Sequence, residues 1–562
     1  MKKFTLIIYL ILSVTILKAQ TALFIPDTIS GSNINLTIAD SSLQFFPGFN
    51  TSTIGYNGRY LGPTILLNKG QSVTMNVQNQ LMDTTTTHWH GLHVAPINDG
   101  SPHNPILSGN TWSPSFTVMD NAATYWYHPH MHGMTMDQVL KGAAGLIIVR
   151  DSLEATIDLP RKYGIDDFPL VFQFQHMDST TKQIILDDEA DNLTIVNGQV
   201  TAPFLDVPAQ VVRLRMLNAS SHRFFEFGFD DNRTFNQITS DAGLLDAPVP
   251  LTRLMLSPGE RAEILVDFSG QQGSTFYIKQ YGTELPAGYP GGPPDGMGMM
   301  TMGPLDNIDF NLLQLNVIAQ TTDPVATIPT AMTTNTAPSP VGADNYSISI
   351  AGVPMMSMTN FSMNGVQYDM NVINMTTTEN TIMKWTISNQ SMMPHPFHIH
   401  GNHFYVLSVN GATPPLNMRG RKDVATVSPM GGSLVLIKQY TDFSDPTVPY
   451  MYHCHILSHE DNGMMGQFIV NPASSGVLEN GTTDIHQMYP NPVTGVLNVV
   501  IGNENQSSKT ILILNNLGQT ISTFKTTESK IMIPTNEIEA GIYLLSVRDE
   551  NGNTKTTKFI KQ

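Results

Sequence analysis

The sequence is poor in cysteine and in charge. Cys454 is the only cysteine among 562 residues, which excludes a disulfide scaffold. Charged residues make up 13% of the chain, about half the usual share. Asp and Glu outnumber Lys and Arg by 46 to 29, giving a formal net charge of −17. This balance excludes a general electrostatic basis for binding nucleic acid, so we expect no nucleic-acid partner.

Long apolar runs are also scarce, and the one that stands out lies at the N-terminus. Lys2 and Lys3 precede an apolar stretch at residues 4–17, and the small residue Ala19 follows. This arrangement is typical of a secretory signal peptide, and the stretch is short for the roughly 30 Å of hydrocarbon in a bilayer. We therefore predict a signal peptide at residues 1–19 and no transmembrane span in the mature, exported chain. An unpaired thiol in an oxidising compartment then needs a use.

Long amphipathic helical periodicity is scarce as well. Short runs rich in Val, Ile, Thr and Leu recur between Gly, Pro and Asn turns, for example at residues 64–77, 211–217 and 434–437. This pattern predicts an all-β protein built from sandwiches or barrels. Shifts in composition divide the chain into blocks at residues 20–152, 153–320, 343–472 and 484–562, with linkers at 321–342 and 473–483.

Histidines gather in four short clusters, each containing a His-x-His pair. In a β-strand, residues i and i+2 share a face, so each pair directs two imidazoles to the same side. Imidazole is a good ligand for copper, zinc, iron and nickel. One buried histidine is more often an ordinary core residue, but four such pairs in one chain predict metal sites. The pairs are His88 with His90, His128 with His130, His398 with His400, and His453 with His455.

Cys454 lies between the histidines of the last pair. On an extended strand its sulfur points away from both imidazoles, so one tripeptide can serve two metal centres. His395, His459 and Met464 complete a set of two imidazoles, one thiolate and a thioether. That set is typical of a blue-copper electron-transfer site. Zinc also accepts Cys and His but transfers no electrons, and Met464 alone could be a packed core methionine.

Together these clusters resemble the four copper signatures of three-domain multicopper oxidases, over roughly residues 50–472. Shorter matches resemble the bacterial cuprous-oxidase and laccase branch of that family, at Leu61–Thr64, Asn197–Gly198, Ser257–Arg261, Met363–Gly365 and Tyr368–Asn371. The resemblance implies three cupredoxin-like Greek-key β-barrel or sandwich domains at residues 20–152, 153–320 and 343–472. It also implies four copper ions per chain, with none in the middle domain.

The resemblance further implies a role for each ligand. A type 1 copper would take electrons one at a time from a reducing substrate, and a trinuclear cluster would reduce dioxygen to water. Asp99 and Glu460 fall at family positions near that cluster, where they are expected to serve in catalysis by supplying protons. The implied ligands are His395, Cys454, His459 and axial Met464 for type 1 copper, His88 and His398 for type 2, and His90, His128 and His455, then His130, His400 and His453, for the two type 3 coppers.

The reducing substrate is suggested by the 31 methionines, since thioethers favour Cu(I). Met297, Met299, Met300 and Met302 lie in a Gly/Pro-rich loop, and Met393 directly precedes the His395 cluster. We therefore favour oxidation of Cu(I) or another metal ion. Laccase-like oxidation of phenols or aromatic amines stays open, because the methionine tracts are short and Ser391 stands where the cuprous-oxidase branch tends to have an acidic residue. A copper-sequestering protein without activity is a third alternative.

The last block, residues 484–562, is expected to be a small β-sandwich. It contains Tyr489-Pro-Asn-Pro492 and alternating apolar segments at 496–500, 510–514 and 541–547. The block resembles the C-terminal sorting domain of the type IX secretion system. That resemblance implies secretion machinery as a partner and a location outside, or on the surface of, a bacterium with two membranes. A carbohydrate- or protein-binding module is the alternative.

Overall fold

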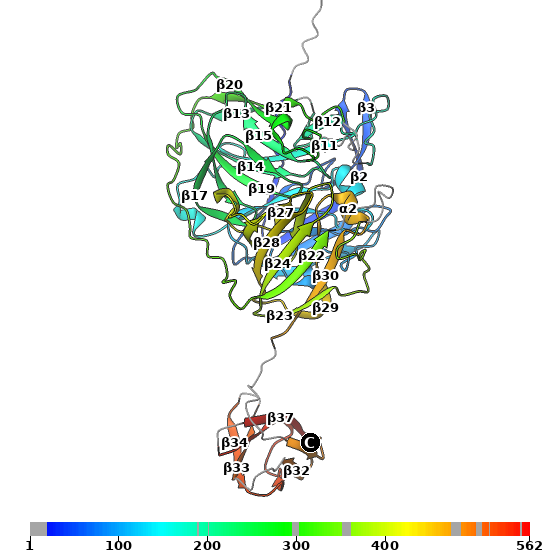
Figure 1. Ribbon diagram of the computed structural model, residues 1–562, viewed down its shortest axis with the longest axis vertical. Coiled ribbons are helices and arrows are strands. Elements are labelled where there is room, and N and C mark those ends of the chain that lie inside the picture. Colours follow the sequence, from blue (N-terminus) through cyan, green and yellow to red (C-terminus); the bar gives the residue numbers. More distant parts are fainter. Residues whose placement is uncertain are drawn as a thin grey trace, which may run out of the picture. The chain divides into compact units, whose positions relative to one another are not determined.

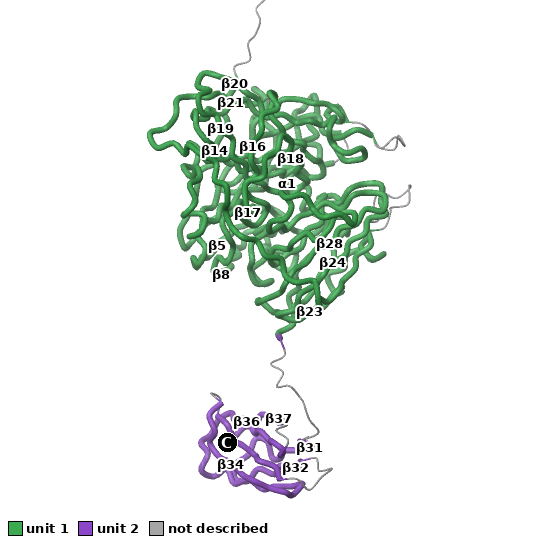
Figure 2. Tube along the Cα trace, turned by 60° about the vertical axis from the view of Figure 1, so that its left-hand side comes forward, with its two compact units in different colours: residues 1–472 green, residues 473–562 purple. Residues whose placement is uncertain are grey.

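A computed structural model describes residues 20–187, 190–200, 202–294, 303–350, 361–473, 485–501, 508–515, 518–550 and 554–562. The predicted signal peptide and Met297, Met299, Met300 and Met302 lie outside these ranges. The chain divides into two compact units, Met1–Pro472 and Ala473–Gln562, coloured separately in Figure 2. Among the described helices, none combines the length and the hydropathy required of a membrane span.

The first unit contains three pairs of β-sheets that follow one another along the chain. In the first pair, Ile34, Leu36 and Ile38 of one strand are buried while the residues between them are more exposed, as expected of a strand with one face on a core. Its two sheets run β1-β4-β10-β9-β6 and β3-β2-β5-β7, with β8 beside β5. The strands are β1 (Thr28–Ser30), β2 (Asn33–Phe46), β3 (Phe49–Tyr56), β4 (Thr64–Asn68), β5 (Ser72–Asn79), β6 (His88–His90), β7 (Thr111–Trp112), β8 (Ser115–Thr117), β9 (Ala123–His128) and β10 (Gly145–Arg150).

The middle pair occupies residues 167–318, and its strands β11 and β14 are buried along their whole length. One face of β14 packs its apolar side chains into the core, while Arg213 and Arg215 on the other face pair with buried carboxylates. The sheets run β12-β11-β14-β19-β16-β17 and β13-β21-β20-β15-β18. The strands are β11 (Asp167–Gln175), β12 (Leu193–Val196), β13 (Phe204–Pro208), β14 (Val211–Asn218), β15 (Phe225–Phe229), β16 (Phe235–Ser240), β17 (Gly243–Leu251), β18 (Leu254–Leu256), β19 (Arg261–Asp267), β20 (Thr275–Tyr281) and β21 (Asp309–Ile318).

The third pair occupies residues 344–471, and its core surrounds Trp385. The strands β22, β24 and β28 lie side by side in Figure 1. The two sheets run β22-β24-β28-β26 and β23-β30-β29-β25-β27. The strands are β22 (Asp344–Ile350), β23 (Met375–Thr378), β24 (Ile382–Asn389), β25 (His395–Ile399), β26 (Tyr405–Val409), β27 (Val424–Val427), β28 (Gly432–Gln439), β29 (Asp445–Cys454) and β30 (Met465–Asn471).

The helices are short. Helix α1 (Thr135–Leu140) belongs to the first sheet pair and packs against α2 (Leu457–Asp461), which follows β29. The Asp461 carboxylate accepts hydrogen bonds from the backbone N–H groups of Thr135 and Met136 at 3.1 and 2.8 Å. This contact joins the first and third sheet pairs beside the histidine clusters. Four 3-10 turns complete the described helices: η1 (Pro96–Asn98), η2 (Glu154–Thr156), η3 (Gly282–Glu284) and η4 (Leu416–Met418).

The C-terminal unit has its own apolar core, built from side chains such as Leu497, Ile511 and Val547. Its sheets run β31-β32-β35 and β34-β33-β36-β37. The strands are β31 (Ile485–Tyr489), β32 (Val496–Ile501), β33 (Lys509–Leu514), β34 (Thr520–Thr526), β35 (Lys530–Pro534), β36 (Gly541–Arg548) and β37 (Thr554–Lys561).

The predicted all-β architecture is confirmed, with one local correction. The apolar run at residues 64–77 forms two strands instead of one, because the chain turns between β4 and β5. Gly70 occupies this turn with φ +85°, a conformation that favours glycine. The two strands belong to different sheets, so the turn carries the chain from one layer of the sandwich to the other.

Candidate metal centre

The histidine clusters meet between the first and third sheet pairs. Strands β6 and β9 pair so that His88 lies opposite His128, while β25 and β29 pair so that His398 lies opposite His453. The two strand pairs lie hundreds of residues apart in the sequence, yet the imidazoles on and beside them form three compact groups. The groups that could hold a metal ion are His130 with His400 and His453, His90 with His128 and His455, and His88 with His90 and His398.

In the first group, three imidazole nitrogens point at one another. The Nε2 atoms of His130, His400 and His453 are separated by 3.1 to 3.3 Å. The other nitrogens face acceptors: Nδ1 of His400 donates to Asp99 Oδ2 at 2.7 Å, and Nδ1 of His453 lies 3.0 Å from Glu460 Oε2. With the protons on Nδ1, three Nε2 lone pairs converge. A bound cation removes the repulsion between them.

The second group repeats this arrangement with different nitrogens. His90 Nδ1 lies 3.4 Å from His128 Nε2 and 3.3 Å from His455 Nε2. The Nε2–H group of His90 donates to Asp423 Oδ1 at 3.1 Å, and Nδ1–H of His128 donates to the carbonyl oxygen of Pro129 at 2.7 Å. In the His90 and His128 rings, hydrogen bonds on the far side thus leave the other nitrogen's lone pair directed at the point that His455 Nε2 also faces.

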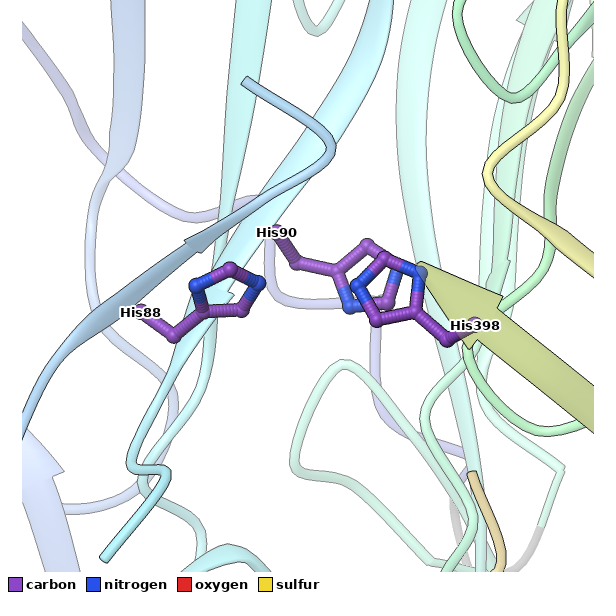
Figure 3. Close-up of side chains that lie close together, drawn as sticks. All are labelled: His88, His90 and His398. Carbon is purple, nitrogen blue, oxygen red and sulfur yellow. The ribbon is translucent and has the colours of Figure 1, made fainter. Parts of the chain in front are cut away.

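His88 and His398 lie between the two groups, and Figure 3 shows them with His90. Their Nδ1–H groups donate to the backbone carbonyl oxygens of Asp99 and Asp423 at 2.8 and 2.7 Å. Their Nε2 atoms are buried and have no hydrogen-bond partner among the described residues. The His398 ring stacks on that of His90, with centroids 3.9 Å apart. Two buried nitrogens without partners fit a metal ion better than they fit an apolar core.

Burial favours the neutral form of most of these imidazoles. Loss of solvent lowers the pKa of His130 to about 4 and that of His455 to about 3, and it lowers the pKa of His88, His90, His398 and His400 well below the usual value. Metal ligands must offer a lone pair, so neutral histidines are the binding form.

Asp99 and Glu460 both contact the group formed by His130, His400 and His453. Burial raises the pKa of Asp99 well above its usual range, opposed only by Lys438. Burial also disfavours the Glu460 carboxylate, but His130 and His453 outweigh that effect and hold its pKa well below the usual range. Asp99 and Glu460 therefore differ in readiness to carry a proton, although both are wholly buried.

A separate pocket surrounds Cys454. Its Sγ lies 3.4 Å from His395 Nδ1 and 3.6 Å from His459 Nδ1. Cys454 pairs with Phe397 across β25 and β29, whereas His453 pairs with His398, so neighbouring residues face opposite sides of the sheet. The structure thus brings one sulfur and two imidazoles together on one face of β29 and sends the flanking imidazoles to the histidine groups.

Met464 and Met393, the remaining predicted site residues that the structure describes, lie beside this pocket. Met464 is wholly buried in the same core cluster as Cys454, and its carbonyl oxygen accepts the Cys454 backbone N–H at 3.1 Å. Met393 is half-buried against that cluster. The His459 ring stacks on Phe361, with centroids 4.1 Å apart. The loop that holds Met297, Met299, Met300 and Met302 is outside the described residues, so the structure does not place it.

The donor sets fit copper. Two imidazoles with one thiolate suit a copper ion that transfers electrons, and clustered imidazoles suit copper, zinc or iron. Burial raises the pKa of the Cys454 thiol, so in the absence of a cation this sulfur stays protonated. A metal in the pocket would reverse that preference by stabilising the thiolate.

Comparison with known proteins identifies the family. The multicopper oxidase family matches residues 37–154 and again residues 342–474, and the secretion system C-terminal sorting domain matches residues 487–562. These matches cover both segments that supply the histidines. The chain belongs to the multicopper oxidase family, whose members are copper-dependent oxidoreductases that use dioxygen.

Three relatives illustrate the range of similar proteins. Multicopper oxidase mco of Staphylococcus haemolyticus is 33% identical, covering 78% of this chain and 88% of its own length. The cell division protein FtsP of Salmonella typhimurium is 31% identical, covering 79% and 91%. The solved structure of a laccase-like multi-copper oxidase, CueO of Ochrobactrum sp., is 33% identical with a TM-score of 0.71, covering 80% of this chain and all of that one.

Several contacts at the site were not predicted from the sequence. Asp423 orients His90 and His398, Arg261 holds Asp423, and Ser391 Oγ hydrogen-bonds His395 Nε2 at 2.7 Å. In the sequence Ser391 stands out as a departure from the family pattern, but that departure does not predict its hydrogen bond to His395. Asp423 and Arg261 lie far from every His-x-His pair in sequence, so only the folded chain reveals them.

Proposed function

We propose that this chain couples one-electron oxidation of a reducing substrate, preferentially Cu(I) or another metal ion, to four-electron reduction of dioxygen to water. Copper bound in the Cys454 pocket would supply a site for single-electron uptake, and copper in the histidine groups would supply the reducing equivalents for dioxygen. The proposed ligands are His395, Cys454, His459 and Met464 for type 1 copper, His88 and His398 for type 2, and His90, His128 and His455 with His130, His400 and His453 for the type 3 pair.

The position of Cys454 is the observation that carries this proposal. Its sulfur belongs to one donor set, while His453 and His455 belong to two others. The backbone therefore links the pocket to both type 3 groups within one residue in either direction. A protein that only stores metal has no need of such a link, whereas one that moves electrons from a pocket to a dioxygen site does.

Asp99 and Glu460 are the proposed proton-handling residues. The Asp99 carboxylate accepts from His400, and its backbone carbonyl accepts from His88. Glu460 faces His130 and His453 at 3.3 and 3.0 Å. The raised pKa of Asp99 suits a group that holds a proton, whereas the low pKa of Glu460 keeps its carboxylate ionised beside His130 and His453.

The choice of Cu(I) rests on Met393 beside the Cys454 pocket and on a methionine-rich loop of the sequence. Met393 is two residues before His395, and Met297, Met299, Met300 and Met302 form a methionine-rich loop in the sequence. Laccase-like oxidation of phenols or aromatic amines is the alternative. It is favoured by the similarity to the Ochrobactrum protein, a laccase-like multi-copper oxidase with oxidase activity towards lignin model compounds.

Oxygen uptake with matched substrates tests the proposal. Copper-loaded full chain is supplied with Cu(I), Fe(II), Mn(II) or a phenol, and dioxygen consumption is recorded. We expect uptake with Cu(I) at the highest kcat/KM. Uptake with phenols alone would replace Cu(I) oxidation by the laccase-like alternative, and no uptake with any donor would overturn the proposed function.

A length-preserving variant then tests the methionine loop. Met297, Met299, Met300 and Met302 are changed together to Leu, which keeps side-chain volume. Cu(I) oxidation should weaken more than phenol oxidation. Met82→Leu is the control, because Met82 is 86% exposed and lies outside that loop. Equal losses with both donors would remove the loop from substrate binding.

A role without catalysis is the remaining alternative, and the similarity to a cell division protein is consistent with it. Copper sequestration would bind Cu(I) without consuming dioxygen, so the same uptake experiment separates the two. The complete donor sets described above support the enzyme.

The C-terminal unit supports a proposal about location. Its match to secretion system sorting domains suggests that secretion machinery recognises residues 487–562. We propose export across an outer membrane, followed by release or attachment at the cell surface. Deleting residues 485–562 should leave oxidase activity intact but retain the protein inside the cell, as fractionation would reveal.

A further inference from the structure

The middle sheet pair reaches the histidine groups through one turn, residues 257–261, between β18 and β19. Ser257 donates to Glu260 Oε2 from both its backbone N–H and its hydroxyl, each at 2.7 Å, which closes the turn. The turn presents Gly259 and Arg261 to side chains of the other two sheet pairs. Among the described residues, the groups that could hold a metal include none from the middle pair.

Arg261 contacts all three sheet pairs. Its Nη1 and Nη2 each lie 2.6 Å from one oxygen of Asp423, a bidentate pair. Its Nε donates to the carbonyl oxygen of Thr124 in β9 at 3.1 Å, and Nη2 donates to the carbonyl oxygen of Asp241 at 3.1 Å. The side chain is 1% exposed. A buried guanidinium with its donors divided in this way fixes the three segments relative to one another.

Asp423 passes this constraint to two metal-binding side chains. Its Oδ1 accepts from His90 Nε2–H, and its backbone carbonyl accepts from His398 Nδ1–H. Each hydrogen bond fixes the tautomer and the ring orientation, which leaves His90 Nδ1 and His398 Nε2 free for a metal. His90 comes from β6 and His398 from β25, so one carboxylate residue aligns ligands from both sides of the interface.

A second set of ion pairs joins the same two segments with the charges reversed, because here the cation lies beside Asp423 and the anions lie in the middle sheet pair. Lys422, next to Asp423, pairs with Asp241 and Glu260 of the middle pair, each at 2.9 Å. The backbone N–H of Arg261 donates to Asp241 Oδ1 at 2.9 Å. Consecutive residues of each chain segment therefore carry opposite charges that match those of the other segment. Shifting one segment by one residue would bring like charges together, so these charges favour one alignment of the turn with residues 422–423.

Gly259 contributes packing. Its φ of +83° favours glycine, and a Cβ at this position would lie 2.9 to 3.0 Å from the Cδ2, Cγ and Nε2 atoms of His455. Any side chain here would push against the imidazole or displace the turn. The backbone of the middle pair thus forms a wall against which the His455 ring rests.

We propose that residues 257–261 of the middle sheet pair are a positioning element for the histidine groups, in which Arg261 aligns His90 and His398 through Asp423 and Gly259 sets the place of His455. The inference rests on the proposed function. It assigns to residues 257–261 a part in forming the trinuclear site and none in the Cys454 pocket.

Chelator titration of copper-loaded full chain tests this assignment with a readout other than activity. Arg261→Lys keeps the charge but loses the bidentate pair. We expect copper of the histidine groups to leave at a chelator concentration about 10- to 100-fold lower than in the unsubstituted chain, as is typical when an outer partner of a ligand is lost. The visible absorption of the Cys454 site should persist, which also reports that the variant is folded.

Arg215→Lys is the matched control. Arg215 is as buried as Arg261, forms a bidentate pair with Asp167, and donates to Thr124 Oγ1, but it contacts no member of the histidine groups. It should lower the unfolding temperature without changing copper retention. Equal copper retention in the two variants would overturn the proposal.

Gly259→Ala probes the second contact with the Arg261 and Asp423 side chains both still present. It should perturb the spectrum of the copper pair that includes His455 while leaving the Cys454 absorption unchanged. An unperturbed spectrum in Gly259→Ala would remove Gly259 from the proposal. Unsubstituted chain that takes up no copper or no dioxygen would instead overturn the proposed function, so the two failures are distinguishable.

Discussion

The Cys454 pocket and the histidine groups share one strand but are built in different ways. His395, Cys454 and His459 all come from the third sheet pair, within 65 residues of sequence from first to last. Each histidine group combines residues of the first and third pairs, and Arg261 of the middle pair binds Asp423, which accepts hydrogen bonds from His90 and His398. The pocket thus depends on one local fold, whereas the groups depend on the docking of three.

This difference indicates which substitutions should impair the Cys454 pocket and which should impair the histidine groups. A change inside the third sheet pair can remove the pocket and leave the interface intact, because β29 keeps its place through pairing with β25 and β30. A change at the interface can open the histidine groups while the pocket persists. Four substitutions test that separation.

Cys454→Ser should have the largest effect. The substitution removes the sulfur from the pocket, while His453 and His455 remain on a strand held by its neighbours. We expect loss of the intense visible absorption and a fall of turnover to background with every donor. Copper analysis should still find metal in the histidine groups. A variant that stays blue would refute the assignment of the pocket.

His400→Ala should have the reverse effect, impairing the histidine groups while leaving the Cys454 pocket intact. The change removes one of three converging Nε2 atoms and leaves Asp99 Oδ2 without its donor. Oxygen uptake should fall by more than the about 10- to 100-fold typical of losing an outer partner, because a ligand itself is lost. The visible absorption should remain. Unchanged uptake would exclude His400 from the dioxygen site.

Asp99→Asn and Glu460→Gln should give intermediate effects. Both carboxyl groups hydrogen-bond or face imidazoles of the histidine groups but bind no residue of the pocket in the described contacts. We expect oxygen uptake to fall about 10- to 100-fold, the range for outer partners of metal ligands.

The control for this pair is Asp120→Asn. Asp120 is also buried, but its carboxylate accepts the backbone N–H of His93. Steady-state oxygen uptake, with copper content measured in parallel, separates lost proton handling from lost metal. Equal effects of all three substitutions would indicate general destabilisation and contradict a specific role for Asp99 and Glu460.

The contrast between the two regions also explains what the sequence could predict. The spacing of Cys454 between two histidines is a local pattern, and the alternation of a β-strand converts it directly into geometry. The all-β fold followed from short apolar runs, except where the turn at Gly70 divides one run into two strands. Local periodicity carried these predictions.

Contacts made by docking were beyond such reasoning. Arg261 and Asp423 are 162 positions apart, and no repeat or spacing connects them. The sequence placed Arg261 within a family-like motif, but its partner became visible only once β19 and β27 were assembled. The middle block, in which the resemblance implies no copper, therefore contributes polar groups such as Arg261 at this interface.

Met393→Leu should have the smallest effect, and it tests whether Met393, beside the Cys454 pocket, helps bind the reducing substrate. The swap conserves volume, so we expect a change of less than about 1.5 kcal/mol in the free energy of unfolding. If the thioether helps bind Cu(I), KM for Cu(I) should rise by up to about 10-fold, which corresponds to about 1.4 kcal/mol of lost binding. KM for a phenol should stay constant, since a phenol gains little from a soft sulfur donor.

Met363→Leu is the control, because Met363 is buried in the same core cluster and would report packing alone. A rise in both KM values, or an equal rise in the control, would assign Met393 to the core and leave the metal preference to residues elsewhere around the pocket.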